Sequence, residues 1–368
     1  MYRRRSRAIL TFFARAILSF IWWQLILPRL GLRRLSRATL SRRLRAAAVD
    51  FRRLAVSMGG VMIKVGQFLS SRLDVLPPEV TSELAGLQDE VSPAPFEHIR
   101  PILEAEFECR LEEKFAAFDP AAHAAASIGQ VYKASIELDG QAVPVMVKVQ
   151  RPDIDKIVEV DLSALRVVGG WMMRYAPIRK RANVPSLLEE FSRSLYEEID
   201  YLHEGKNAEI FGENFADQPD VRVPHVYWSH TSRRVLTLED VEGIKIGDYA
   251  AIEAAGVSRA EAAERLFKTY LQQIFEDRFF HADPHPGNLF IIPRGEPGEG
   301  PRPWTLVFID FGMTGEISAG MVGGLKDILI AVGSRDAARM VKAFERMGVL
   351  LPGADTSELE RAMSAVFE

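Results

Sequence analysis

The stretch His281-Ala282-Asp283-Pro284-His285-Pro286-Gly287-Asn288, followed by Asp310-Phe311-Gly312, decides the fold of this chain. A carboxylate can orient or deprotonate a nucleophile, and amide and carboxylate oxygens can hold Mg²⁺ against phosphate groups. Asp283 and Asn288 are five residues apart. The residues therefore predict phosphoryl transfer, with Asp283 as the catalytic carboxylate and Asn288 and Asp310 as Mg²⁺ ligands.

This spacing is that of the kinase catalytic loop H-R-D-x-x-x-x-N, with alanine at 282 in place of arginine, and Asp310 opens an intact D-F-G. Two other interpretations exist. Asp-Pro and Pro-Gly-Asn are also common turn sequences, and His281 with His285 could be a two-histidine metal site. No acidic or histidine partner at metalloprotease spacing accompanies that pair, and the order of the motifs favours phosphoryl transfer.

A nucleotide-binding hairpin is predicted upstream. Val145-Met146-Val147-Lys148 resembles the kinase V-A-I-K strand, whose lysine contacts the α- and β-phosphates. Predicted strands at 130–138 and 143–150 flank the turn sequence Asp139-Gly140. The preceding loop overlays G-x-G-x-x-G-x-V with alanine at the first two glycine positions. The candidate nucleotide-binding residues here are Ala124, Ala125, Ala126, Ser127, Gly129, Val131 and Lys148. Because alanine reaches positive φ only at a cost, we expect this loop to handle phosphate differently from a glycine loop.

The order of predicted elements favours an α+β, two-lobed fold. Residues 46–118 have a mostly helical pattern, and a further helical stretch covers about 153–211, interrupted near Pro177 and Pro185. Other predicted strands are 221–228, 234–239, and the hairpin 289–292 with 305–309, and a long helix is predicted near 259–278. We expect a membrane-associating segment at 1–45, a helical extension at 46–118, an N-lobe at 119–240 and a C-lobe at 241–368.

The same residues resemble the UbiB/AarF family of atypical kinases, whose members act in coenzyme Q biosynthesis. The alanine-rich loop and the sequence from His281 to Asn288 are shared features. Lys64-Val65-Gly66-Gln67 is similar to the family's K-x-G-Q, and Glu198-Ile199-Asp200 to its E-x-D. The resemblance runs from about residue 60 to 315.

The resemblance implies a two-lobed protein-kinase-like fold with ATP and Mg²⁺ as cofactors. It implies that Lys148 pairs with a helix glutamate, for which we favour Glu204. Glu198 and Asp200 would face Lys64 and Gln67, in an extension that occupies the region where a kinase docks a peptide. The implied catalytic set is Asp283, Lys148, Glu204, Glu198, Lys64 and Gln67. Glu239 and Val241 would belong to the hinge that hydrogen-bonds adenine. Family members generally continue with more helices, so the C-lobe is expected to be truncated.

The N-terminal segment predicts contact with a membrane. Residues 1–53 hold 14 arginines and one acid, a charge of +13, which leaves −17 for the remainder of a chain whose net charge is −4. Residues 8–27 are mostly apolar, with Arg15 as their only charge, so a spanning helix is possible, but an interfacial helix avoids the cost of a buried arginine. A signal or transit peptide and a nucleic-acid arm are alternatives. The sequence shows no cleavage site of small residues, which a signal peptide would have. A nucleic-acid arm would not need the apolar run. Cys109 is the only cysteine, so a reducing compartment is expected.

These patterns predict a membrane-associated kinase or ATPase at the cytoplasmic face, and the resemblance implies that it supports quinone or isoprenoid-lipid metabolism. Its expected partners are anionic membrane lipid and a lipid-like or isoprenoid substrate or lipid-biosynthesis proteins, with no nucleic acid. Two alternatives are a phosphotransferase of the aminoglycoside or choline type and a non-catalytic nucleotide-gated scaffold. The first has no reason to carry residues 64–67, and intact Lys148, Asp283, Asn288 and Asp310 weigh against the second.

Overall fold

The computed structural model describes residues 2–72, 76–87, 93–176, 179, 183–295, 302–350 and 355–367. The chain forms two compact units. The first combines Met1–Gly205 with His225–Asp240, and the second combines Lys206–Pro224 with Val241–Glu368. The predicted interruption at Pro177 and residues 296–301 of the loop after the predicted strand 289–292 lie outside the described residues.

The first unit contains an antiparallel sheet of β1 (Ala117–Ala125), β2 (Gly129–Leu138), β3 (Gln141–Gln150) and β5 (Val235–Glu239), in that order. Asp139 and Gly140, with φ of 51° and 77°, form the tight turn between β2 and β3 that their sequence predicts. The predicted strands 130–138, 143–150 and 234–239 are confirmed by this sheet.

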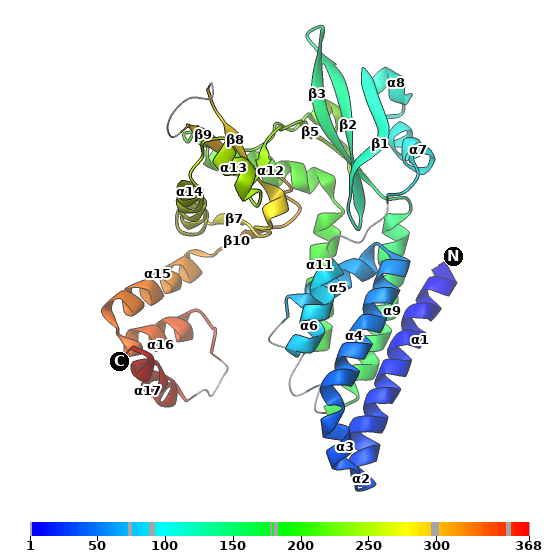
Figure 1. Cartoon of the computed structure of the whole chain (residues 1–368), viewed down its shortest axis with the longest axis vertical. Helices are drawn as coiled ribbons and strands as arrows, with labels where there is room; N and C mark the ends of the chain where they lie inside the picture. The colour runs from blue at the N-terminus through cyan, green and yellow to red at the C-terminus, as the bar shows by residue number, and fades with distance from the viewer. Residues whose placement is uncertain are drawn as a thin grey trace. The chain divides into compact units, whose positions relative to one another are not determined.

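Helices make up the rest of the first unit (Figure 1). They are α1 (Tyr2–Ile21), the π-helical turn η1 (Trp22–Ile26), α2 (Leu27–Arg29), α3 (Arg33–Ala38), α4 (Leu40–Met58), α5 (Val61–Ser70), α6 (Pro78–Leu84), η2 (Ala85–Leu87), α7 (Phe96–Phe107), α8 (Leu111–Lys114), α9 (Ile154–Met173), α11 (Val184–Glu198) and η3 (Trp228–His230). Helix α12 (Tyr201–Asn214) begins in the first unit and ends in the second.

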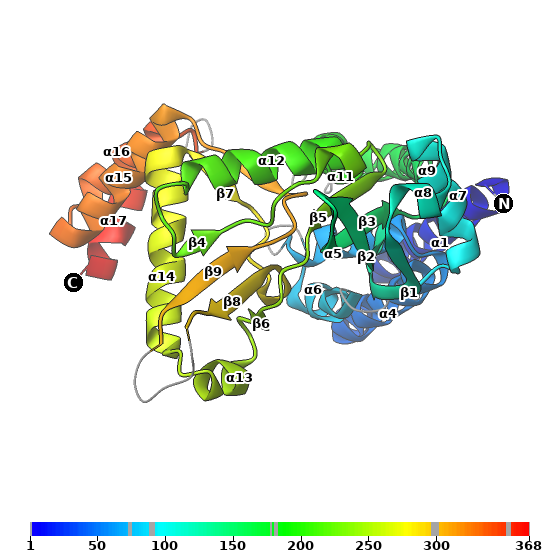
Figure 2. The ribbon, with the colours of Figure 1, turned by 90° about the horizontal axis from the view of Figure 1, so that it is seen from above.

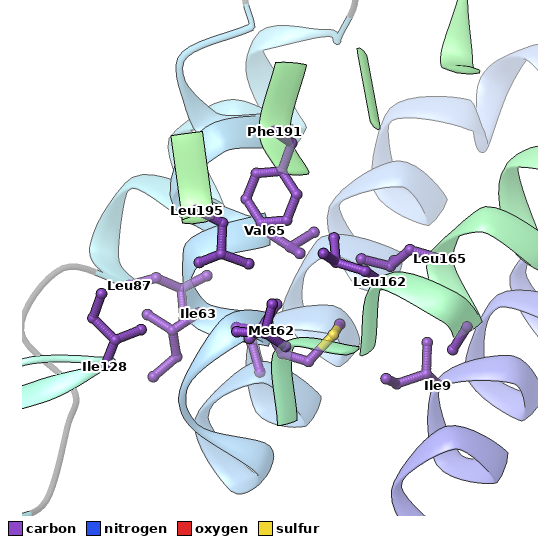
Figure 3. Close-up of a cluster of buried hydrophobic side chains, with 14 of the residues drawn as sticks. Ile9, Met62, Ile63, Val65, Leu87, Ile128, Leu162, Leu165, Phe191 and Leu195 are labelled. Carbon is purple, nitrogen blue, oxygen red and sulfur yellow. The ribbon is translucent and has the colours of Figure 1, made fainter. Parts of the chain in front are cut away.

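A helical core holds α5 in place (Figure 3). Met62, Ile63 and Val65 of α5 are buried against Leu162 of α9 and Phe191 of α11. Gly59 and Gly60 have positive φ of 62° and 58° and make the sharp turn from α4 into α5. The helical extension is therefore an integral part of the first unit, because it shares a hydrophobic core with α9 and α11.

Helix α1 is anchored to this core by a buried ion pair. The Arg5 guanidinium donates to both carboxylate oxygens of Asp161 on α9, each at 2.7 Å. It also donates to the carbonyls of Met58 and Gly59, at 2.7 and 3.1 Å, just before α5 begins. The side chains of Arg5 and Asp161 are 7% and 0% exposed. The N-terminal half of α1 is thus fixed to the junction of α4 and α5.

The second unit contains a sheet in the order β4-β9-β8-β6 (Figure 2). Its strands are β4 (Val221–Arg222), β6 (Ile244–Lys245), β8 (Leu289–Pro293) and β9 (Trp304–Phe308). Strands β7 (Phe279–His281) and β10 (Thr314–Glu316) form a separate antiparallel pair. The helical elements are α13 (Tyr249–Ala254), α14 (Arg259–Gln272), η4 (Gln273–Asp277), η5 (Pro286–Asn288), α15 (Ala319–Ser334), α16 (Ala337–Arg346) and α17 (Thr356–Phe367).

The α+β class, the hairpin β8–β9 and the predicted interruption of the helical stretch near Pro185 are confirmed. Helix α11 begins at Val184, and Pro185 lies in its first turn, where its missing N–H costs nothing. The strand expected at 221–228 was wrong, because it ends at Arg222 and Trp228 begins η3 instead. The strand β1 was not predicted, because its alanine-rich sequence carries no β-branched residue.

The buried ion pair generates a stability prediction. Replacing Arg5 by alanine leaves the Asp161 charge without its partner, so we expect Arg5→Ala to lower the free energy of unfolding by about 3–5 kcal/mol. Arg7→Ala, at an exposed position of the same helix, should change it by less than about 0.5 kcal/mol. Chemical denaturation of both variants measures the difference, and equal stabilities would contradict the anchoring role of Arg5.

The loss of stability that we expect in Arg5→Ala should also depend on pH. Burial raises the pKa of Asp161, and the Arg5 hydrogen bonds and charge oppose that rise. Without Arg5, the folded-state pKa lies further above the unfolded value, so the folded state takes up a proton as pH falls. The stability gap between Arg5→Ala and the wild type should therefore narrow from neutral pH toward pH ~4. A gap that stays constant over this range would contradict the explanation.

Candidate active site

The first unit places Lys148 against Glu204, the glutamate that we favoured. Lys148, on β3, has its Nζ 2.8 and 2.9 Å from the two carboxylate oxygens of Glu204, on α12. Glu204 is 1% exposed, so a nearby cation is required to keep a charged carboxylate there. Asp200, at the start of α12, accepts hydrogen bonds from the backbone of Leu202 and His203. That cap fixes the first turn of the helix that carries Glu204.

Tyr201 is a site residue that the sequence analysis missed. Its ring lies under the Lys148 ammonium, with Nζ 5.2 Å from the ring centroid, and it is 0% exposed. A Cβ at Gly129 would lie 2.2 Å from the Tyr201 hydroxyl oxygen. Glycine at 129 is therefore needed for close packing against Tyr201, and only the position of Tyr201 inside the E-x-D-x sequence could have pointed to it.

The alanine loop differs from the sequence expectation. Ala124 and Ala125 end β1, and Ala126 with Ser127 belongs to the connection to β2. None of these alanines has positive φ, so the expected conformational cost does not arise. The Ala126 N–H donates to the Gly129 carbonyl at 2.9 Å, and the Arg151 side chain donates to the Ala126 carbonyl at 3.0 Å. The loop is a closed turn with Ser127 buried and Ala124 and Ala126 exposed. Val131, in β2, pairs with Ala124.

Lys64, on α5 of the helical extension, forms an ion pair with Glu198 at the end of α11. Their side chains are 22% and 16% exposed, so the pair is only partly desolvated. Gly66 of the same motif is required by close packing, since a Cβ at this position would lie 2.2 Å from Leu87 Cδ1. Gln67 is half-buried. The structure thus brings Lys64 to Glu198, while Asp200 instead caps α12.

The predicted hinge residues lie where the chain passes from one unit to the other. Glu239 is the last residue of β5, and its N–H donates to the His225 carbonyl at 2.9 Å. Val241 is the first residue of the second unit in this part of the chain. Their proposed contact with adenine stays a prediction.

The second unit holds Asp283, Asn288 and Asp310 around a rigid loop. The Asn288 side-chain amide donates to the Asp283 carbonyl and to its carboxylate, at 3.2 and 3.0 Å. This use of Nδ2 leaves the Asn288 carbonyl oxygen as the atom that could bind a metal. Asp310 has a positive φ of 62°, which a non-glycine residue rarely adopts. Asn288 ends η5 directly before β8, and Asp310 follows β9. Both side chains offer oxygen atoms, which suit Mg²⁺, because this ion prefers few protein oxygens together with phosphate oxygens.

His281 and Asn207 hold the Asp310-Phe311-Gly312 segment. His281 is fully buried, and its Nε2 lies 2.9 Å from the Asp310 carbonyl oxygen. Because a carbonyl can only accept, we assign the proton to Nε2. Asn207, on α12, donates to the Phe311 carbonyl at 3.1 Å. Sequence reasoning did not identify Asn207, although it lies three residues after Glu204 on the same helix.

Tyr270 stays a neutral phenol next to this loop. Burial raises its pKa to about 12, and the negative charge of Asp283 adds to the rise. The phenol therefore does not compete with Asp283 as a proton acceptor at neutral pH.

Comparison with known proteins agrees with this geometry. The family model described as "ABC1 atypical kinase-like domain" matches residues 86–344. The chloroplastic protein ACTIVITY OF BC1 COMPLEX KINASE 8 of Arabidopsis thaliana is 39% identical over 306 residues, which are 83% of this chain and 39% of the relative. The probable protein kinase UbiB of Marinobacter nauticus is 34% identical over 320 residues, 87% of this chain and 57% of the relative.

Among solved structures, Rv3197 of Mycobacterium tuberculosis, in complex with erythromycin, is similar with a TM-score of 0.55 and 26% identity. The match covers 87% of this chain and 77% of that one. The chain spans only 39% and 57% of the length of the two named kinase relatives. The motifs, their positions in the fold and these similarities lead to one conclusion: the chain belongs to the ABC1 atypical kinase-like family and has a protein-kinase-like fold.

Proposed function

We propose that the chain binds Mg-ATP and transfers its γ-phosphoryl group to an acceptor molecule or to water. The pairing of Lys148 with the buried carboxylate of Glu204, in a chain of this family, is the observation that carries the proposal. Such a pair holds the ammonium ready to contact nucleotide phosphates. Asp283 would orient the attacking hydroxyl and accept its proton. Intact residues for each of these steps favour catalysis over a purely scaffolding role.

Mg²⁺ would be held by the Asn288 carbonyl oxygen and the Asp310 carboxylate, and it would neutralise charge on the phosphates. The chain's own residues prepare this arrangement. The Asn288 amide is oriented by Asp283, and the Asp310 backbone is held in its unusual conformation with help from His281. Glu239 and Val241 would bind adenine through their backbone. Protein phosphorylation in trans is expected to be weak, because of the extension that carries Lys64.

We also propose that the protein works at a membrane in quinone or other isoprenoid-lipid metabolism. The similarity to UbiB and to the chloroplastic relative supports this role. The helical stretch Tyr2–Arg29 is long and apolar enough to cross a bilayer, but Arg5 and Ile9 are buried in the first unit. A helix that crossed the bilayer would have to withdraw both from the core.

Interfacial contact avoids that cost. Beyond the anchored half of α1, exposed apolar side chains include Leu18, Trp22, Leu30 and Leu32. Arginines accompany them at 29, 33, 34 and 37, and each basic residue near an anionic surface contributes about 1 kcal/mol. The end of the α1–α4 hairpin that carries α2 and α3 would therefore lie on anionic lipid at the cytoplasmic face.

Nucleotide binding can be tested by ligand-induced stabilisation. A ligand at 100 times its Kd stabilises the folded state by about 2.7 kcal/mol, so Mg-ATP should raise the melting temperature of the wild type by several degrees. Asp310→Asn and Lys148→Ala should lose most of this shift, each measured against its own baseline. Asp217→Asn and Lys326→Ala change similar residues at exposed positions and should keep it. Full shifts in both site variants would show that the nucleotide site is wrongly placed.

Membrane contact can be tested without deleting α1, which would also remove Arg5 from the core. We expect Leu18→Asp combined with Trp22→Asp to lower sedimentation with vesicles of phosphatidylcholine and phosphatidylglycerol by at least about tenfold, because two apolar anchors become charged. The control Phe267→Asp with Val349→Asp changes two exposed apolar residues of the second unit. Equal sedimentation of the two double variants would contradict the proposed lipid surface.

A further inference from the structure

A cavity of about 550 Å³ lies in the second unit, next to the catalytic loop. Pro284 and Pro286 of that loop line it, and Pro284 directly follows Asp283. Helices α13 and α14 contribute Ile252 and Leu266 to its walls. This volume is within the range of roughly 300–1,000 Å³ that is typical of small-molecule sites.

The floor of the cavity is preformed and apolar. Ile252 and Leu289 are each 1% exposed, and both line the cavity. Leu289 directly follows Asn288, so the catalytic loop and the cavity floor are parts of one short segment. A molecule bound in this cavity would lie beside the segment that carries Asp283 and Asn288. Its apolar surface would be removed from water and would contact aliphatic side chains.

The charge of the lining selects the ligand. Arg259 is the one charged side chain among the lining residues in the described part of the chain. Its guanidinium lies 4.2 Å from the centroid of the Tyr249 ring, so that ring face is already occupied by a cation. Recognition of a cationic alcohol uses carboxylates or open aromatic faces. The lining residues include no carboxylate, and the neighbouring carboxylate of Glu253 already pairs with Arg259 at 3.5 Å. A neutral ligand meets no such penalty.

We propose that this cavity binds the apolar body of a neutral hydrophobic alcohol, of the aliphatic or isoprenoid class, as the acceptor subsite of the enzyme. The ligand class follows from the lining, whereas its role as phosphoryl acceptor rests on the proposed function. The cavity also differs from a site for a cationic alcohol, since its lining gives such a substrate no unpaired carboxylate.

The test uses farnesol as the neutral alcohol and choline as the cationic one, with binding measured by calorimetry on the full chain without nucleotide. Ala263 lines the cavity and is exposed, so Ala263→Phe can fill the space without disturbing the core. We expect it to weaken farnesol binding at least about tenfold, and Ala260→Phe, at a second exposed lining position, to act in the same direction. Ala250→Phe, exposed on α13 and outside the lining, should leave the affinity unchanged.

The outcomes separate the two proposals. Farnesol affinity that neither Ala263→Phe nor Ala260→Phe lowers would overturn the subsite, as would choline binding that is as tight as farnesol binding. The Mg-ATP melting shift is measured on the same preparations. If that shift is absent while farnesol binding still depends on Ala263, the proposed function fails and the apolar site stands. A loss of affinity in Ala263→Phe that Ala250→Phe does not share excludes farnesol that is held only by the exposed apolar surface near the N-terminus.

Discussion

The buried carboxylate of Glu204 is the constraint on which the candidate site depends. A charged carboxylate that is 1% exposed needs a cation, and the Lys148 ammonium donates hydrogen bonds to both of its oxygens. Replacing only one partner would leave a buried charge, so β3 and α12 must keep their relative positions. The same helix carries Asn207, which holds the Phe311 carbonyl in the second unit. Helix α12 therefore contacts Lys148 through Glu204 and the Asp310-Phe311-Gly312 segment through Asn207.

A second buried pair gives the N-terminal segment two roles. Arg5 and Asp161 fasten the first half of α1 to α9 and to the turn before α5. The second half of α1 exposes Leu18, and η1 exposes Trp22. The segment is thus a structural element at one end and a candidate lipid surface at the other. Composition alone favoured a separate membrane segment, because a run of arginines and apolar residues does not reveal which arginine has a buried partner.

Much of the site was predictable because it is local in sequence. Asp283, Asn288 and Asp310 follow fixed spacings, and the turn at Asp139-Gly140 has a strong chemical signature. The missing parts depend on contacts between distant segments. Tyr201 packs against Gly129, which lies 72 residues earlier in the sequence. The periodicity of the sequence does not indicate this contact. Strand β1 and the Arg5–Asp161 pair are likewise set by tertiary packing, which overrides local propensity.

The central claim is that Asp283 promotes transfer of the γ-phosphoryl group by activating the attacking hydroxyl. The rate at which ATP loses its γ-phosphate tests this claim most directly. Single-turnover reactions with γ-labelled ATP and Mg²⁺ would follow the loss of the label in the wild type and in Asp283→Asn, alongside nucleotide affinity. A general base contributes roughly 10²–10⁴-fold, so we expect the variant to bind Mg-ATP normally and to release the label at least about 100-fold more slowly. Equal rates of label loss in the two proteins would contradict the account.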